Sequence, residues 1–258
     1  MRSLSDSDLL NLWERGLRRH PLDRALLALS QVFPETTYDR LADWPLGRRN
    51  QALAELHCMY FGQKLQGWIS CASCGEKLEF ELDGRVITAD ELNNDLGSRS
   101  DEPIVVNRGT FRLPTSRDLA KAAQETDPRL AAISIVENCR IAPGQSPRMS
   151  TDSGETSGQV PDLRSESWSD EDLEEIGERM ASADPLAETR LTLHCPKCEN
   201  DWEATLDIVS FLWTEIEARA RRLLLEIHTL ASAYGWTETE ILSLSENRRA
   251  RYAEMVQS

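Results

Sequence analysis

The apolar residues of positions 1–63 recur at helical spacing and predict an N-terminal helical region. Ser5 or Ser7 can cap a first helix, and a second helix begins at Pro21, because proline suits the first turn of a helix. A third helix is expected from Pro45 to Gly62. The side chains expected to face the core are Leu9, Leu12, Trp13, Leu17, Leu22, Leu26, Leu27, Leu29, Ala52, Leu53, Leu56, Tyr60 and Phe61.

Residues 64–142 change from an alternating apolar pattern to a helical one. Two short alternating runs predict a pair of strands around a first Cys-x-x-Cys motif. Residues 103–113 predict a second hairpin, with a three-residue Asn-Arg-Gly loop. Two helices should follow, one capped by Thr115 or Ser116 and the other opened by Asp127. The second of these helices is expected to bury Leu130, Ile133, Val136 and Cys139.

Residues 143–168 are rich in Ser, Gly, Thr, Pro and acidic residues and nearly lack apolar anchors, which predicts a disordered insert. Residues 169–258 return to helical spacing around a second pair of short strands. The longest helix should run from Asp207, a suitable N-cap, to about Tyr234, with Gly235 as its C′ residue. Its expected buried stripe is Val209, Leu212, Trp213, Ile216, Ala220, Leu223, Ile227, Leu230, Ala231 and Tyr234.

Each of the two Cys-x-x-Cys motifs lies between short strand patterns. The first joins Cys71 and Cys74, and the second, about 120 residues later, joins Cys195 and Cys198. This pattern is typical of a zinc knuckle, and four thiolates complete a tetrahedral zinc shell with no open position for water or substrate. The sequence therefore predicts one structural zinc per chain, bound by all four cysteines. Such a metal would join two distant parts of the chain and contribute to folding.

Other uses of the cysteines are disfavoured. A thioredoxin-like redox pair opens a helix in a βαβ unit, whereas both motifs here lie between strands. Disulfides need an oxidising compartment, but the polar, acidic start of the chain is not a secretory signal. The thiols are therefore expected to stay reduced in the bacterial cytoplasm. Cys58, Cys139 and His57 are expected to be packing residues, and His228 a surface or packing residue.

The composition argues against several classes of protein. A net charge of −15 and a pI near 4.8 oppose sequence-independent nucleic-acid binding through a basic surface. No apolar run approaches the roughly 20 residues of a membrane span. The chain has no Gly-rich phosphate loop, no His-Glu-x-x-His and no Gly-x-Ser-x-Gly, so it is not expected to be an enzyme. The basic residues of the last helix, Arg248, Arg249 and Arg251, are expected on a solvated face.

Two longer stretches resemble a known family. Residues 111–119 read Phe-Arg-Leu-Pro-Thr-Ser-Arg-Asp-Leu and precede a helix that ends near Cys139. The second stretch contains Cys195-Pro-Lys-Cys198, Trp202, Asp207-Ile208, Phe211-Leu212-Trp213, Arg222-Leu223-Leu224, Glu226-Ile227-His228, Ala233-Tyr234-Gly235-Trp236, Glu240-Ile241-Leu242, Leu244-Ser245, Arg248-Arg249 and Tyr252. Together they resemble the baseplate hub or hub-assembly proteins of contractile phage tails and extracellular contractile injection systems. The resemblance covers most of residues 66–140 and 185–256.

The resemblance implies a structural or assembly role in a baseplate hub, with other baseplate proteins as partners. It implies no catalytic residue, and it leaves open whether the protein stays in the tail-like particle or acts only as a chaperone in the cytoplasm. The alternative is a zinc-ribbon adaptor or regulator that binds nucleic acid or the transcription machinery. That alternative predicts a basic or aromatic patch on the knuckles, where the nearby basic residues are Lys77, Arg85 and Lys197.

The expected fold class is α+β and predominantly helical. It combines a small split zinc-ribbon-like β module with flanking helices and a long C-terminal helix. The expected regions are residues 1–63, 64–142, 143–168 and 169–258, and the two knuckles share one domain.

Overall fold

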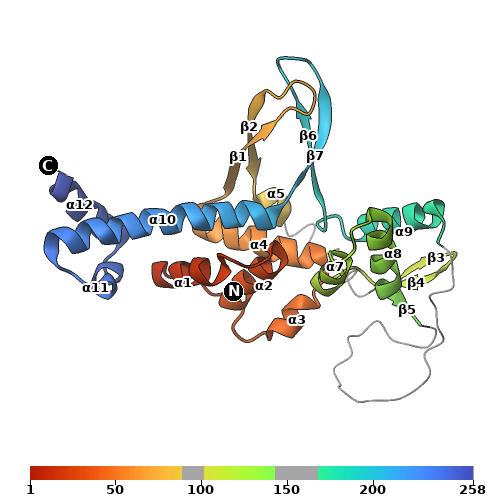
Figure 1. Cartoon of the computed structure of the whole chain (residues 1–258), viewed down its shortest axis with the longest axis horizontal. Helices are drawn as coiled ribbons and strands as arrows, with labels where there is room; N and C mark the ends of the chain where they lie inside the picture. The colour runs from red at the N-terminus through yellow and green to blue at the C-terminus, as the bar shows by residue number, and fades with distance from the viewer. Residues whose placement is uncertain (89–101, 143–167, 258) are drawn as a thin grey trace.

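Helices dominate a mixed α+β fold in the computed structural model, which describes residues 1–88, 102–142 and 168–257. All described strands pair antiparallel. This confirms the expected class at the level of a mainly helical α+β protein. Figure 1 shows three parts: a helical body, two β hairpins that rise together from it, and a smaller unit beside it.

The helical body is built from both ends of the chain. Helices α1 (Asp6–Gly16), α2 (Pro21–Val32), α3 (Tyr38–Ala42) and α4 (Leu46–Phe61) pack with α10 (Ile208–Tyr234). Ser5 caps α1 in a capping box, and Pro21 occupies the first turn of α2, both as predicted. Leu17, expected in the core, is instead 44% exposed, because α1 ends at Gly16 and Leu17 is its C-cap.

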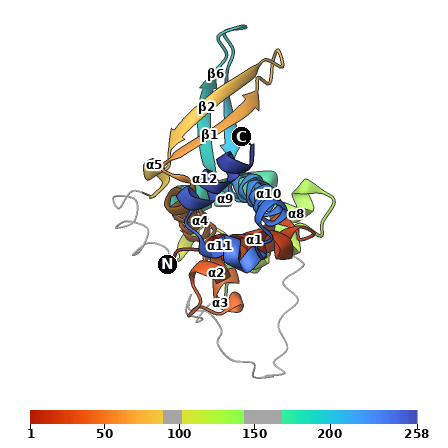
Figure 2. The ribbon, with the colours of Figure 1, turned by 90° about the vertical axis from the view of Figure 1, so that its left-hand side faces the viewer.

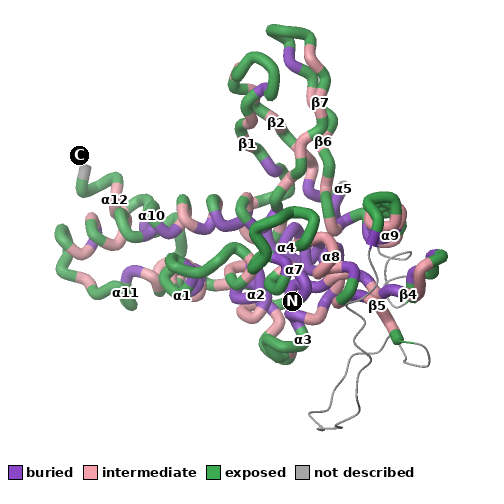
Figure 3. The backbone as a smooth tube through the Cα atoms, turned by 45° about the vertical axis from the view of Figure 1, so that its right-hand side comes forward, coloured by how far each residue is buried: buried purple, intermediate pink, exposed green. Residues whose placement is uncertain are grey.

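The two hairpins stand side by side on one face of the body, as Figures 1 and 2 both show. The first pairs β1 (Lys64–Ser70) with β2 (Lys77–Asp83) and leads into the short α5 (Arg85–Thr88). The second pairs β6 (Thr189–His194) with β7 (Asp201–Leu206). Exposed and half-buried residues alternate along them (Figure 3), so each hairpin has one covered and one solvated face.

The smaller unit has its own apolar core. A three-stranded sheet of β3 (Ile104–Val106), β4 (Gly109–Phe111) and β5 (Arg140–Ile141) accompanies α7 (Ser116–Ala122), α8 (Pro128–Cys139) and α9 (Asp170–Ala183). Helix α9 and Trp168 also contribute to this core, although they come from a later part of the sequence than the other elements. The buried core consists of Ile104, Val106, Phe111, Leu113, Val136, Cys139, Trp168, Ile176 and Met180.

Three expectations for this unit are tested by the structure. The hairpin loop is shorter than predicted, because Gly109 pairs with Val106 and leaves a two-residue turn. Leu130, expected to be buried, is 48% exposed near the start of α8, whereas Cys139 is fully buried as expected. Residues 143–167 of the expected insert lie outside the described residues.

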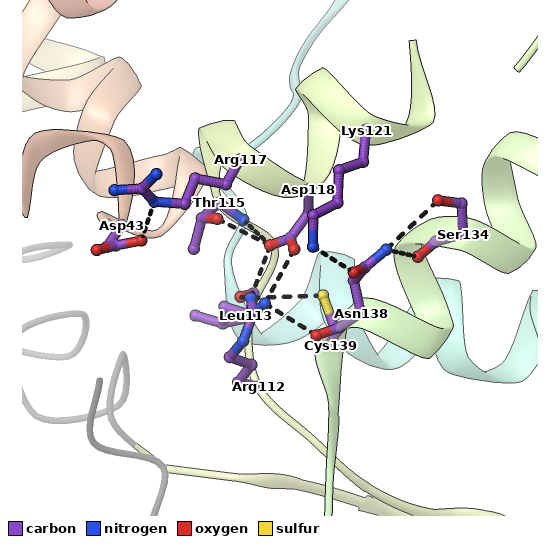
Figure 4. Close-up of polar contacts among 10 residues, drawn as sticks. All are labelled: Asp43, Arg112, Leu113, Thr115, Arg117, Asp118, Lys121, Ser134, Asn138 and Cys139. Carbon is purple, nitrogen blue, oxygen red and sulfur yellow. Dashed lines mark hydrogen bonds and ion pairs between the residues drawn. The ribbon is translucent and has the colours of Figure 1, made fainter. Parts of the chain in front are cut away.

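The Leu-Pro-Thr-Ser-Arg-Asp-Leu stretch forms a polar junction, drawn in Figure 4. Arg112 donates to both carboxylate oxygens of Asp118, at 2.7 and 2.9 Å, and to the Asn138 carbonyl at 2.9 Å. The buried Asp118 also accepts from the Thr115 backbone N–H and hydroxyl at the start of α7. Arg117 reaches out of the unit to Asp43 at 2.6 Å. The stretch therefore fixes a strand end, two helix ends and the contact with the body.

Helix α10 begins and ends where the sequence predicts. Asp207 is its N-cap, and Gly235 adopts the left-handed conformation at its end. Tyr234, expected in the buried stripe, is 39% exposed because α10 extends beyond the body there. Helices α11 (Glu238–Ser243) and α12 (Glu246–Gln257) then fold back onto α10. None of the described helices is long and apolar enough to cross a lipid bilayer.

One arginine of α12 is buried, although the sequence predicts that it lies on a solvated face. Arg248 and Arg251 are exposed, as expected, but Arg249 is only 1% exposed. Its guanidinium contacts carboxylates that come from other helices, Asp6 at the start of α1 and Glu226 in α10. Since these acids lie far away in the sequence, the local pattern of α12 gave no sign of them.

Candidate metal centre

The two Cys-x-x-Cys turns have the same backbone construction. The Cys71 N–H donates to the Glu76 carbonyl at 2.8 Å, and the Cys195 N–H donates to the Asn200 carbonyl at 3.0 Å. In each turn the residue after the second cysteine donates back to the carbonyl of the first cysteine, at 3.0 Å in the first turn and 2.8 Å in the second. These bonds close each hairpin tip around its two cysteines.

The residue after the second cysteine adopts a left-handed conformation in both turns. It is Gly75 in the first hairpin, with φ of 72°, and Glu199 in the second, with φ of 56°. Glycine adopts this conformation without strain, whereas a side chain is disfavoured there. Glu199 is the one non-glycine residue with positive φ in the described part of the chain. The second turn therefore keeps this geometry against a local conformational cost.

The four predicted ligands come together at the tips of the hairpins. All four sulfur atoms lie within 4.8 Å of one another. Cys71 and Cys198 are 3.7 Å apart, and so are Cys74 and Cys195. A tetrahedral zinc site with Zn–S bonds of about 2.3 Å has sulfurs about 3.8 Å apart, so the cluster fits a metal ion such as zinc.

Burial alternates around the cluster. Cys71 and Cys195, the first cysteine of each motif, are 3% and 0% exposed, whereas Cys74 and Cys198 are exposed. Each 3.7 Å contact therefore joins the buried cysteine of one hairpin to the exposed cysteine of the other. Cys58 and Cys139 are not part of the cluster, in agreement with their predicted packing roles.

The electrostatics of the cluster favour a bound cation. Backbone N–H groups of Cys74 and Ser73 donate to the Cys71 sulfur and help to lower its pKa to about 7. At Cys198 the Asn200 N–H lowers the pKa, but desolvation and the three neighbouring thiols outweigh it and raise the pKa to about 12. Four thiolates this close repel one another strongly, so full ionisation requires a positive ion among them.

An ion pair joins the two turns next to the sulfurs. The Lys197 ammonium lies 2.5 Å from a carboxylate oxygen of Glu76 in the opposite hairpin. Both side chains are largely solvent-exposed, so the pair adds little stability by itself. The ion pair instead helps to align the second turn with the first. The sequence shows Lys197 as a basic residue within the second motif but contains no local signal for this pairing.

Helix α4 anchors both hairpins at their base. Strand β1 follows α4 directly in the chain, after Gly62. The segment that leads into β6 is bonded to the same helix, since Asn50 donates to the Leu186 and Ala187 carbonyls at 2.9 and 3.0 Å. The buried Asp184 also accepts from the Gly47 N–H at 2.8 Å. These contacts hold the base of the second hairpin beside α4, which leads directly into the first hairpin.

The predicted packing histidine lies away from the cluster. His57 is 1% exposed in α4, and its ring lies 5.4 Å from that of Phe61 and 5.3 Å from that of Phe211. Burial lowers its pKa, so the ring is neutral at pH 7. His57 is therefore a core residue, as the sequence indicated.

Comparison with known proteins found no family model, no curated protein and no solved structure that matches the chain.

Proposed function

We propose that this protein is a structural or assembly component of a contractile-tail baseplate hub. It acts through protein–protein contacts and carries one structural zinc bound by Cys71, Cys74, Cys195 and Cys198. Under this proposal the paired hairpins form a split zinc ribbon. The sulfur cluster supports a closed shell, since four ligands leave the metal no position for substrate. The resemblance of residues 66–140 and 185–256 to baseplate proteins supplies the biological setting.

The C-terminal arm, defined as residues 224–257, is the part best suited to contact a partner. Figure 1 shows the end of α10 with α11 and α12 extending beyond the body. Leu225 and Met255 are each 66% exposed on this arm. The rings of Tyr234, Trp236 and Tyr252 also cluster there, with centroids 4.7 to 5.7 Å apart. Exposed aromatic and apolar side chains are typical of interface centres.

Two experiments in the native host test this role. Deletion of the gene should leave sheath and tube subunits expressed but not assembled into complete particles. Normal particles in the deletion strain would refute the role.

Purification of the tagged protein should also recover baseplate subunits. We expect Leu225→Glu with Met255→Glu to lose these subunits, whereas Leu130→Glu, which changes an exposed leucine of the smaller unit, should retain them.

The adaptor alternative has one feature in its favour, the exposed Trp68 on the outer face of the first hairpin, at 70% exposure. However, Trp68 lies opposite Glu79 across the strands, and the Lys64 ammonium is neutralised by Glu81 at 2.7 Å. A stacking platform for nucleic acid needs a basic groove beside the ring. A mobility-shift assay at low salt should therefore show no binding of nucleic acid.

A further inference from the structure

The pairing of an exposed cysteine with a buried one in each contact bears on how the cluster would react with an oxidant. A peroxide attacks a solvent-accessible thiolate first and converts it to a sulfenic acid. Cys74 and Cys198 are the exposed residues of the cluster, and we infer that their sulfurs react first. The sulfenic acid then condenses with a nearby thiol, and the resolving partners in contact are Cys195 and Cys71. Both contacts cross from one hairpin to the other.

We propose that hydroperoxides convert the cluster from a metal-bound to a disulfide-bound form, in which Cys71–Cys198 and Cys74–Cys195 bonds join the two hairpins. Each sulfur pair, now 3.7 Å apart, must shorten to the disulfide length of about 2.05 Å. The surrounding turns can follow because the tips are largely exposed. The proposal rests on the metal centre of the proposed function, but not on the identity of any baseplate partner.

The chemistry balances with peroxide as the only added oxidant. Four thiolates, two hydrogen peroxide molecules and four protons give two disulfides and four water molecules. Each peroxide O–O bond accepts two electrons from one sulfur pair. A divalent metal ion held by the four thiolates would be released, because its ligands are consumed. The hairpins thus remain fastened after metal loss, whereas disulfides within each motif would release them.

The sequence makes the pairing measurable by mass spectrometry. Trypsin leaves Cys71 and Cys74 together in the peptide 65–77, but it cuts after Lys197 and so separates Cys195 from Cys198. In the zinc-loaded full chain treated with hydrogen peroxide, we expect peptide 65–77 to be linked to both 191–197 and 198–219. A colorimetric chelator should detect metal release, and titratable thiols should fall from six to two.

The half-buried Cys58 and the buried Cys139 serve as internal controls and should remain reduced. A peptide 65–77 with an internal disulfide, free of the other two peptides, would overturn the proposal. Sulfinic acids without disulfides would do the same. Metal content measured before oxidation tests the zinc centre separately. A chain without metal would contradict both the zinc centre and the conversion from a metal-bound form, whereas the peptide map tests the disulfide pairing alone.

Double variants resolve which cysteine pairs with which. Cys74→Ser with Cys195→Ser leaves only the cross-hairpin pair, and Cys195→Ser with Cys198→Ser leaves only the same-hairpin pair. We expect the first variant to form its disulfide faster under the same peroxide concentration. Equal rates, or a faster same-hairpin pair, would count against the proposal. Circular dichroism establishes that both variants are folded, and the wild-type peptide map stands independently of them.

Discussion

The Arg249 guanidinium in the last helix donates a hydrogen bond to the Asp6 carboxylate at the start of the first helix. Arg249 also donates to Glu226 at 3.1 Å and to the Leu244 carbonyl at 2.8 Å. Asp6 in turn accepts from Arg219 and, at 3.1 Å, from the Tyr60 hydroxyl. Burial would raise the pKa of Asp6, but these partners together lower it. A single network therefore holds α12 against the start of α1 and the C-terminal part of α10.

Replacing the buried arginine should loosen the C-terminal arm. Arg249→Met leaves Asp6 and Glu226 without their shared cation, and we expect a loss of about 3 kcal/mol in the free energy of unfolding. Arg251→Met, which changes an exposed arginine of the same helix, should cost less than about 0.5 kcal/mol. Urea denaturation of both variants measures the difference. Equal stabilities would show that the network does not hold α12 in place.

The Arg112–Asp118 pair should make the free energy of unfolding depend on pH in the acidic range. Although burial favours the neutral acid, Arg112 and Thr115 keep the pKa of Asp118 below its usual value. The stabilisation from Asp118 is therefore complete above the unfolded-state pKa of about 3.9, and it is lost as the pH falls through the lower folded-state pKa. At pH 7 we expect Asp118→Asn to cost about 3 kcal/mol.

Unfolding measured from pH 7 down to pH 2 checks this prediction. The stability difference between Asp118→Asn and the wild type should narrow as the pH falls below about 4. Asp170→Asn is a suitable control, because this carboxylate is 86% exposed in a surface pair with Arg129. A constant difference across the whole range would contradict the assigned pKa direction.

The metal content and the thermal stability should change together. Cys198→Ser is expected to lower both, since three thiolates no longer close the shell, and a chelator should lower the Tm of the wild type in the same way. Cys58→Ser should retain the metal, because this thiol lies outside the cluster. Elemental analysis should give one zinc per wild-type chain. A result of no zinc, or of two, would rule out a shared four-cysteine site.

The left-handed residues of the two turns should respond in opposite directions. Glu199→Gly removes the strain of a side chain at positive φ and should stabilise the protein by up to about 1 kcal/mol. Gly75→Ala introduces the same strain into the first turn and should destabilise it by about 1 kcal/mol. No atom lies within 4 Å of the added Cβ, so the effect is conformational. Thermal unfolding of the zinc-loaded variants would reveal the opposite shifts.

Local chemistry made much of this structure predictable from sequence. Helix starts at Ser5 and Asp207 were found because their side chains bond to backbone groups two or three residues away. The cysteine cluster was found because ligand spacing and flanking strands have a short-range pattern. Leu17 and Tyr234 were assigned wrongly because apolar residues at helical spacing do not show where burial stops. Leu17 follows the end of α1, and Tyr234 lies where α10 extends beyond the body.

Contacts between distant segments could not be read from periodicity. The bonds from Gly47 to Asp184 and from Asp6 to Arg249 join residues 137 and 243 positions apart. A helical pattern tells which face is apolar but not which partner will cover a polar position. The two-residue β5 is also too short to produce an alternating pattern. It forms because α8 ends beside β4.

The chain enters the smaller unit from the base of one hairpin and leaves it at the base of the other. The body and the hairpins are therefore completed by residues on both sides of the segment 84–188. A single cut in that segment would produce two fragments, each with one cysteine pair and part of the body core. Neither fragment could close the metal shell alone. Mixed together, they should reassemble, and the protein could then be studied as a two-piece complementation system.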